Sequence, residues 1–156
     1  MPEGRALHVE DEEDEGRIVS VFGALTQARE GHASAFVAGP DCPAGCVYLL
    51  GGGTSDSWST RDVVRYDPAS PHGDVTRRDV LLLPRADATA VALEGRIYLF
   101  GGFAVETYAY SVEVYDVASN TTEEIEPPEW VDLGRTGIAA VALGESIYLF
   151  GGCSWY

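Results

Sequence analysis

The chain has 156 residues, of which 46% are hydrophobic and 22% charged, and its formal net charge is −15. This composition is that of a globular protein with enough apolar residues for one domain. All 10 basic residues are arginines, and the acidic excess disfavours binding to nucleic acid and to anionic membranes. No apolar run is long enough to cross a bilayer and no signal-peptide pattern opens the chain, so we expect a cytoplasmic location.

An acidic leader opens the chain. Residues 10–15 are 6 acidic residues in a row, and blocks of like charge are usually solvated and without fixed structure. We therefore expect residues 1–16 to be a disordered acidic leader and residues 17–156 to form the folded domain.

β-Strands are predicted throughout the first part of the folded domain. Runs of β-branched and aromatic residues, each ended by glycine or proline, predict them. The predicted strands cover residues 18–22, 32–37, 46–50, 63–67 and 75–83. The segment 38–45 holds two glycines and two prolines, and it is predicted to be a loop.

The second part of the domain repeats this plan. Its predicted strands cover residues 88–93, 96–100, 111–116, 121–126, 137–143 and 147–150. Glu94-Gly95 and Gly144-Glu145 are two-residue connections of the kind that β-hairpins prefer. The segment 103–110 is rich in aromatic residues, and it is predicted to be a loop.

A short motif recurs with a fixed period. Tyr-Leu-Phe-Gly-Gly ends at Gly102 and at Gly152, Tyr-Leu-Leu-Gly-Gly ends at Gly52, and successive copies are 50 residues apart. Such a period is the signature of a repeat architecture. No window has a helical period, so each repeat is predicted to be a four-stranded antiparallel sheet. One strand in a repeat is rich in alanine, as is required where sheets converge on an axis, and this predicts an all-β partial propeller.

The segment from Arg85 through Gly101-Gly102 to Val112–Asp116 resembles a kelch repeat, and the resemblance covers residues 17–152. It implies blades at about residues 29–83 and 85–126 and an incomplete blade at 135–156. The double glycines are the mark of the family, and they permit close backbone approach. These structural glycines are Gly51, Gly52, Gly101, Gly102, Gly151 and Gly152.

Two features depart from the family pattern. Gly73 and Thr122 stand where the family usually has a tryptophan, which predicts loosely packed outer strands. The first repeat also carries an insertion between Arg29 and Gly51.

Three repeats cannot close a propeller, which takes roughly 4–8 blades. Three arrangements remain open: a fragment of a longer chain, which we favour, self-association to complete the ring, and a stable open arc. In the family an N-terminal strand often completes the last blade, and the strand at 18–22 could do so here.

Cys42, Cys46 and Cys153 give no complete disulfide framework because their number is odd. Cys42 and Cys46 would close a small loop if oxidised, but free, partly buried thiols are expected. No histidine lies near them in sequence, so we expect no metal site and no cofactor.

Three arginines recur in phase, each just before an innermost strand: Arg29, Arg85 and Arg135. The resemblance implies that they lie where kelch adaptor proteins contact acidic peptides, and a guanidinium group binds carboxylates in pairs. The alternative, which we favour for any single arginine, is a hydrogen bond or salt bridge to neighbouring blade turns.

Aromatic residues gather in the loops after the double glycines, where they are either binding anchors or packing between blades. They are Trp58, Phe103, Tyr108, Tyr110 and Trp155. Tyr66 and Tyr115 are assigned to the core, and His32 is expected to be a core or rim residue rather than a ligand.

No catalytic signature is present, neither Gly-x-Ser-x-Gly nor His-Glu-x-x-His. We therefore expect a non-enzymatic protein–protein interaction module that binds a peptide or protein through loops and arginines at one rim. The alternative is a fragment of a kelch-type propeller enzyme that acts on a sugar or small metabolite. It follows from the resemblance of some kelch propellers to sugar oxidases, sialic acid mutarotases and iron-assisted specifier proteins.

Overall fold

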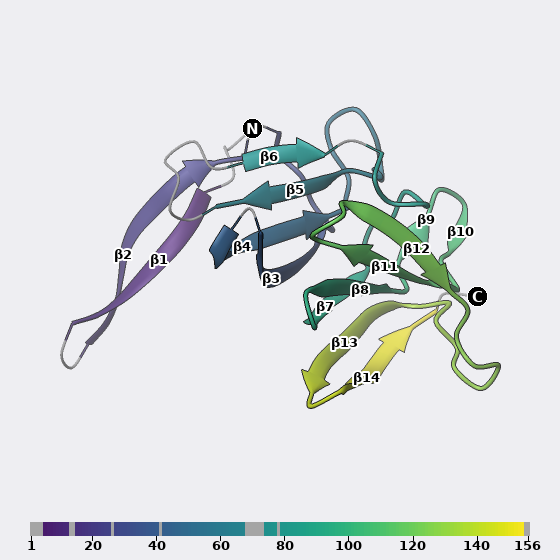
Figure 1. Ribbon diagram of the computed structural model, residues 1–156. Coiled ribbons are helices and arrows are strands. Elements are labelled where there is room, and N and C mark those ends of the chain that lie inside the picture. Colours follow the sequence, from purple (N-terminus) through teal and green to yellow (C-terminus); the bar gives the residue numbers. More distant parts are fainter. Residues whose placement is uncertain are drawn as a thin grey trace.

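The computed structural model describes residues 5–12, 15–25, 27–40, 42–67, 74–77 and 79–154. These residues form strands and the turns between them, and they include no helix that is long and apolar enough to cross a membrane. The sheets of the three repeats lie side by side in sequence order, and a separate N-terminal hairpin lies beyond the first sheet (Figure 1).

Each of the first two repeats folds into one four-stranded antiparallel sheet. The first sheet contains, in order, β3 (Ala33–Gly39), β4 (Cys42–Leu50), β5 (Val63–Tyr66) and β6 (Asp74–Arg77). The second contains β7 (Thr89–Leu93), β8 (Arg96–Phe100), β11 (Val112–Asp116) and β12 (Thr121–Ile125). The third repeat contributes β13 (Thr136–Leu143) and β14 (Ser146–Cys153). The prediction of an all-β partial propeller is confirmed.

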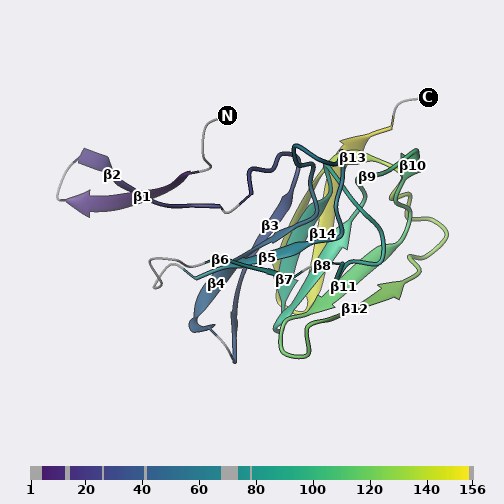
Figure 2. The ribbon, with the colours of Figure 1, turned by 90° about the horizontal axis from the view of Figure 1, so that it is seen from above.

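Two further hairpins lie outside these sheets. β9 (Phe103–Ala104) and β10 (Thr107–Tyr108) form a short pair within the aromatic loop. β1 (Arg5–Glu12) pairs with β2 (Glu15–Ala24), which contains the strand predicted at 18–22. We expected disorder up to residue 16, but β2 gives the backbone of β1 an antiparallel partner. Seen from above, this hairpin stands apart from the sheets (Figure 2).

The strand boundaries that differ most from the predicted ones are the start of β4 and the end of β6. β4 begins at Cys42, inside the predicted loop 38–45, because Cys42 pairs with Gly39 across a tight turn. β6 ends at Arg77, well before residue 83. The chain leaves the sheet there because the amides of Leu82 and Leu83 donate to the carboxylate of Glu113 instead of a neighbouring strand.

Apolar side chains fill the two spaces between successive sheets. Buried residues of the first space include Tyr48, Leu50, Ile97 and Leu99, and those of the second include Phe100, Val114, Leu133 and Ile138. Ala88, Ala90 and Ala92 pack against the first cluster, and β7 contacts both β3 and β13. The inner strands therefore lie next to one another, as their small side chains predict.

The two tyrosines assigned to the core differ in burial. Tyr115 is 1% exposed, and its ring centroid lies 6.0 Å from that of Tyr48. Burial raises the pKa of Tyr115 to about 12, and its hydroxyl donates to Asn120 Oδ1 at 2.9 Å. Tyr66 is half-buried, so the assignment to the core is right for Tyr115 and only partly right for Tyr66.

Cys42 and Cys46 form a disulfide with their Cα atoms 5.9 Å apart, so the expectation of two free thiols is wrong. Gly45 lies between them with φ 98°, a backbone conformation that favours glycine. Cys153 is free and exposed. Disulfides are typical of oxidising compartments, and the cytoplasmic location stays a prediction.

Gly101→Ala should destabilise the fold far more than Gly95→Ala. Both glycines have positive φ, 60° and 78°, which costs an alanine about 1–2 kcal/mol. A methyl group on Gly101 would in addition overlap the main-chain oxygen of Arg135, whereas one on Gly95 would meet nothing within 4 Å. Urea denaturation measures the difference, and equal losses in the two variants would contradict the close approach at Gly101.

Candidate functional site

The three in-phase arginines make the same hydrogen bond in each repeat. Nη1 of each donates to the carbonyl oxygen of the first glycine of its own repeat, and the distances are 2.5, 3.2 and 3.2 Å. The pairs are Arg29–Gly51, Arg85–Gly101 and Arg135–Gly151. Each guanidinium group therefore supports the double-glycine turn at the end of the second strand of its sheet.

The backbone of the same arginines joins neighbouring sheets. The carbonyl oxygen of Arg85 accepts a hydrogen bond from Gly52 N at 2.6 Å, and that of Arg135 accepts one from Gly102 N at 3.0 Å. Arginine and glycine thus meet at each junction, the arginine side chain within its own sheet and the arginine backbone against the preceding one.

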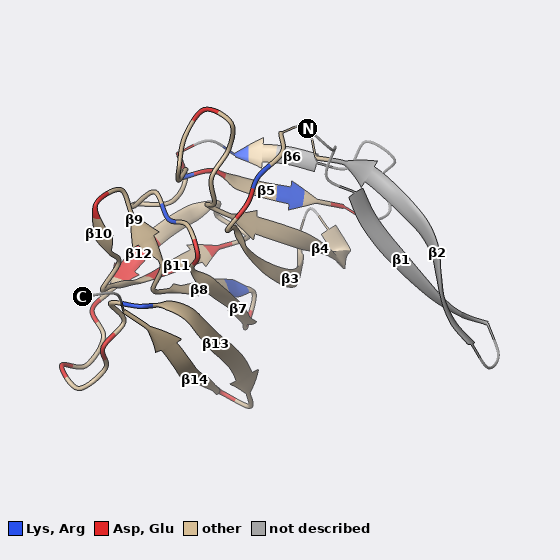
Figure 3. Ribbon diagram, turned by 180° about the vertical axis from the view of Figure 1, so that it is seen from behind, with Lys and Arg blue, Asp and Glu red and all other residues tan. Residues whose placement is uncertain are grey.

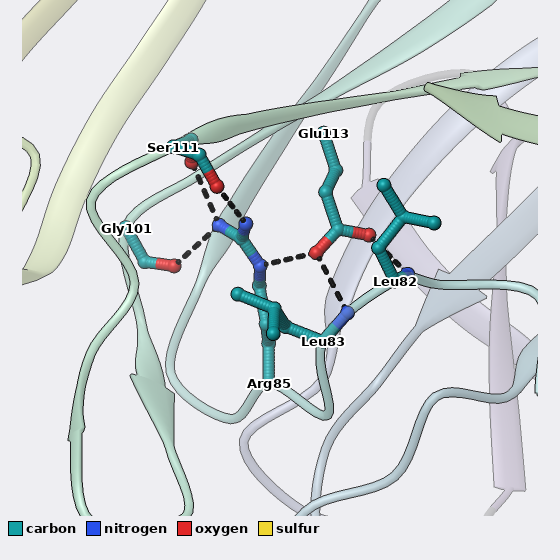
Figure 4. A network of polar contacts seen from close by, with 6 residues as sticks. All are labelled: Leu82, Leu83, Arg85, Gly101, Ser111 and Glu113. Atoms are coloured by element: carbon teal, nitrogen blue, oxygen red, sulfur yellow. Dashed lines mark hydrogen bonds and ion pairs between the residues drawn. The ribbon is translucent and has the colours of Figure 1, made fainter. Parts of the chain in front are cut away.

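Arg85 is fully enclosed by its own repeat (Figure 4). Its Nε donates to Glu113 Oε1 at 2.8 Å, and its Nη1 and Nη2 donate to the carbonyl and hydroxyl oxygens of Ser111. Arg85 and Glu113 are both 0% exposed. A ligand cannot reach this guanidinium group, so the structure favours the structural alternative for Arg85.

Arg29 lacks the partner that Arg85 has. Leu49 pairs with Val64 as Leu99 pairs with Glu113, so a valine stands where the second sheet has its glutamate. Nε and Nη2 of Arg29 are buried without a partner among the described residues. Burial lowers the pKa of Arg29, and the nearby Asp62 carboxylate partly offsets this.

Arg135 is the most accessible of the three. Its side chain is 32% exposed, and Nη2 lies 3.2 Å from Asp132 Oδ2. This salt bridge is local and solvated, so it holds Arg135 weakly.

Trp58 stands between two cavities on the face where the double-glycine loops lie. The side chain is 92% exposed, and it lines a cavity of about 630 Å³ together with Arg29. It also lines a second cavity, of about 580 Å³, together with Phe103. The structure therefore brings together three of the predicted site residues, Arg29, Trp58 and Phe103.

Tyr108 and Tyr110 line neither of these two cavities. Phe103 packs edge-on against Tyr108, with ring centroids 5.4 Å apart. Tyr108 and Tyr110 line a separate cavity of about 350 Å³ between the β9–β10 hairpin and β12. Trp155 lies outside the described residues.

Carboxylates surround the two cavities, and the sequence analysis did not select them. Glu30 lines both cavities, Asp56 the first and Asp87 the second, and all three are exposed. The loop between β9 and β10 is also coloured as acidic (Figure 3), and Glu106 in this loop is exposed. Their positions in turns follow no motif, and the high overall acidity was the only sequence signal for them.

His32 lies directly before β3 and lines a cavity of about 420 Å³ together with Asp87 and Thr136. Nδ1 of His32 is buried without a partner among the described residues. Burial lowers the pKa of His32, and the nearby Arg29 lowers it further. His32 is thus a rim histidine held in its neutral form.

Within the described part of the chain, one cluster has the spacing of metal ligands: Cys42, Cys46 and Asp67. The disulfide occupies both sulfur atoms, so in this state the cluster offers a single carboxylate and could not hold an ion.

Comparison with known proteins gives the family of the second repeat. The sequence profile described as "Kelch motif" matches residues 84–121, which contain β7, β8 and β11. The second blade is a kelch repeat. The chain as a whole has the fold of a partial kelch-type β-propeller.

The fold is shared with proteins of known structure. A protein described as "Structure of YjhT" superposes with a TM-score of 0.76 at 16% sequence identity, over 95% of this chain and 51% of that chain. At this identity the likeness shows the fold alone, and the chain spans about half the length of that protein. No curated protein matches the chain in sequence.

Arg85→Met should destabilise the kelch repeat by about 3–5 kcal/mol, because it leaves the buried carboxylate of Glu113 without its cation. The double variant Arg85→Met/Glu113→Leu should recover part of this loss. Arg135→Met, at the equivalent but exposed position, should change the free energy of unfolding by less than about 1 kcal/mol. Chemical denaturation tests all three, and similar losses for Arg85→Met and Arg135→Met would contradict the structural assignment.

His32 should make the protein less stable in mild acid. Its folded pKa lies below the ordinary value of 6.5, so the unfolded chain binds a proton first as the pH falls. The stability that the neutral imidazole contributes is complete above pH 6.5 and is lost progressively below it. His32→Gln should therefore lose less stability than the wild type between about pH 7 and about pH 5, because the glutamine side chain binds no proton in this range. NMR titration of the His32 ring checks the cause, and a midpoint at or above 6.5 would disprove it.

Proposed function

We propose that the chain is a non-enzymatic interaction module that binds a peptide, or an extended segment of another protein, on the face of the double-glycine loops. The observation that carries this proposal is the position of Trp58, which is 92% exposed and lines two adjoining cavities. A large aromatic side chain that stands in water between two hollows is typical of a binding anchor.

The loop that carries Trp58 is held by its own hydrogen bonds. Thr54 N donates to Ser57 O at 2.7 Å, and Thr60 N donates to Gly52 O at 2.9 Å. The hydroxyl of Ser57 donates to the carbonyl of Ser59 at 2.7 Å. A loop ordered before binding loses little conformational entropy when it meets a ligand, which supports a recognition role for this turn.

The charges around the cavities favour a cationic ligand. Glu30, Asp56 and Asp87 are exposed there, while Arg29 is half-buried and already bonded to Gly51 O. The net charge of −15 adds to this negative potential, which attracts positive segments and repels acidic ones. We therefore replace the acidic peptide implied by the family resemblance with a peptide that carries arginine or lysine beside an apolar side chain.

The arginines contribute unequally to this site. Arg29 forms part of the wall of the first cavity, whereas Arg85 is enclosed and serves the fold. Binding then depends on the loops, and the arginines mainly keep those loops in place.

Panning of the chain against a phage-displayed random peptide library should enrich peptides of positive net charge that contain an aromatic or aliphatic residue. Trp58→Ala should weaken the best synthetic peptide by at least about tenfold, since anchor residues contribute about 2 kcal/mol or more. Fluorescence anisotropy of the labelled peptide measures this change.

Trp130→Ala is the matched control. Trp130 is also highly exposed, at 85%, but it lines neither cavity, so its removal should leave affinity unchanged within about twofold. Enrichment of acidic peptides would contradict the charge argument. Equal losses in the two tryptophan variants would contradict the site.

A further inference from the structure

The last sheet presents an apolar face to water. Four of its side chains are between 46% and 70% exposed: Val141, Leu143, Tyr148 and Phe150. Val141 pairs with Tyr148 in the third repeat as Val91 pairs with Tyr98 in the second. Val91 and Tyr98 pack in the cluster that joins the second sheet to the third. The exposed face is therefore the equivalent of a buried blade-to-blade interface.

The third sheet also has two described strands, whereas each of the first two sheets has four. In the complete sheets the second strand pairs on both sides, β4 with β3 and β5, and β8 with β7 and β11. β14 pairs only with β13 among the described strands. Its free edge is a row of backbone donors and acceptors that can accept a further strand.

The β1–β2 hairpin forms a separate two-stranded sheet. Its two strands correspond in sequence to the third strand and the outer strand of a complete blade. β2 leads into the inner strand β3, as β6 leads into β7 and β12 into β13. Asp11, Asp67 and Asp116 lie 18, 18 and 19 residues before the in-phase arginines Arg29, Arg85 and Arg135. β1 thus occupies the sequence position of β5 and β11, and β2 that of β6 and β12.

Within one copy of the chain, the β1–β2 hairpin cannot pair with the β13–β14 sheet. The β1–β2 hairpin and the β13–β14 sheet lie at opposite ends of the arc (Figure 1 and Figure 2). The hairpin lies on the side of the first sheet that faces away from the second, which is where the preceding blade of a ring belongs.

We propose that two copies of this chain form a closed ring of six blades, in which β1–β2 of each copy completes the β13–β14 sheet of the other. Each copy then supplies two whole blades and half of each of two shared ones. Six blades lie within the range of roughly 4–8 in which propellers close. Since this chain spans 51% of the structurally similar chain, two copies have about the length of one such protein.

This arrangement uses the same pair of contacts twice, so the ring closes with twofold symmetry and leaves no further free face. It covers Tyr148 and Phe150 with the first sheet of the other copy, on the side where Phe36 is 60% exposed. Each copy carries a net charge of −15, so repulsion opposes assembly. Assembly should accordingly strengthen between about 0.05 M and about 0.5 M salt as this repulsion is screened.

Sedimentation velocity of the 156-residue chain, at roughly 1–200 µM, should show a species of twice 16.7 kDa that grows with concentration. Gly151→Ala should weaken assembly by about tenfold, because the added methyl group would meet the Arg29 carbonyl of the other copy as one on Gly101 would meet Arg135. Gly144→Ala is the control, since both glycines have positive φ and a methyl group at either meets nothing within 4 Å in one copy.

A cross-link tests the exchange of strands. Tyr98 pairs with Val114, and Val9 precedes Asp11 as Val114 precedes Asp116, so Tyr148 of one copy should lie opposite Val9 of the other. Val9→Cys/Tyr148→Cys in a Cys153→Ser background should give a covalent dimer on oxidation, and neither single variant should. A monomer at every concentration, a cross-linked monomer, or a dimer that does not cross-link would each overturn the proposal.

Discussion

The hydrogen bond from each in-phase arginine to the first carbonyl of the double glycine is the contact on which the arc depends. That carbonyl lies at the junction of two sheets, where an unpaired polar group would be costly. The glycine has no side chain, so the backbone of the next arginine can approach it, and the arginine supplies the donor. The same hydrogen bond forms although the spacing differs. Arg85 and Arg135 precede their glycines by 16 residues, whereas the insertion in the first repeat places Arg29 22 residues before Gly51.

This constraint decides which residues remain for binding. Arg85 cannot present its guanidinium group to a ligand, because Glu113 and Ser111 complete its hydrogen bonds. In the first sheet Val64 replaces the glutamate, and Arg29 keeps two nitrogens without a described partner. The junction at Arg85 is therefore only structural, whereas the junction at Arg29 lies beside the first cavity of the proposed binding surface.

The sequence predicts the architecture well because the architecture is repetitive. Three copies of one motif, alanine-rich inner strands and hairpin turns all point to radial sheets, and each signal is local in the chain. The site is harder to predict because it depends on contacts across the sheets. Arg85 meets Glu113 28 residues later, and no spacing rule says which arginine receives such a partner. The Cys42–Cys46 disulfide is a local contact, but the odd number of cysteines led us to expect free thiols.

The exposed face of the last sheet is apolar, whereas the face of the double-glycine loops is acidic, so the two surfaces favour different kinds of contact. Tyr148 and Phe150 gain free energy from any apolar cover, whereas Glu30, Asp56 and Asp87 favour solvent or a cation. A second copy of the chain suits the first surface and not the second, because like charges repel across the loops. The two surfaces therefore call for different partners, and closing the ring would leave the loop face free. Ring closure would also place two copies of the Trp58 site on one molecule, so that a ligand with two basic segments could bind with an avidity that a single arc lacks.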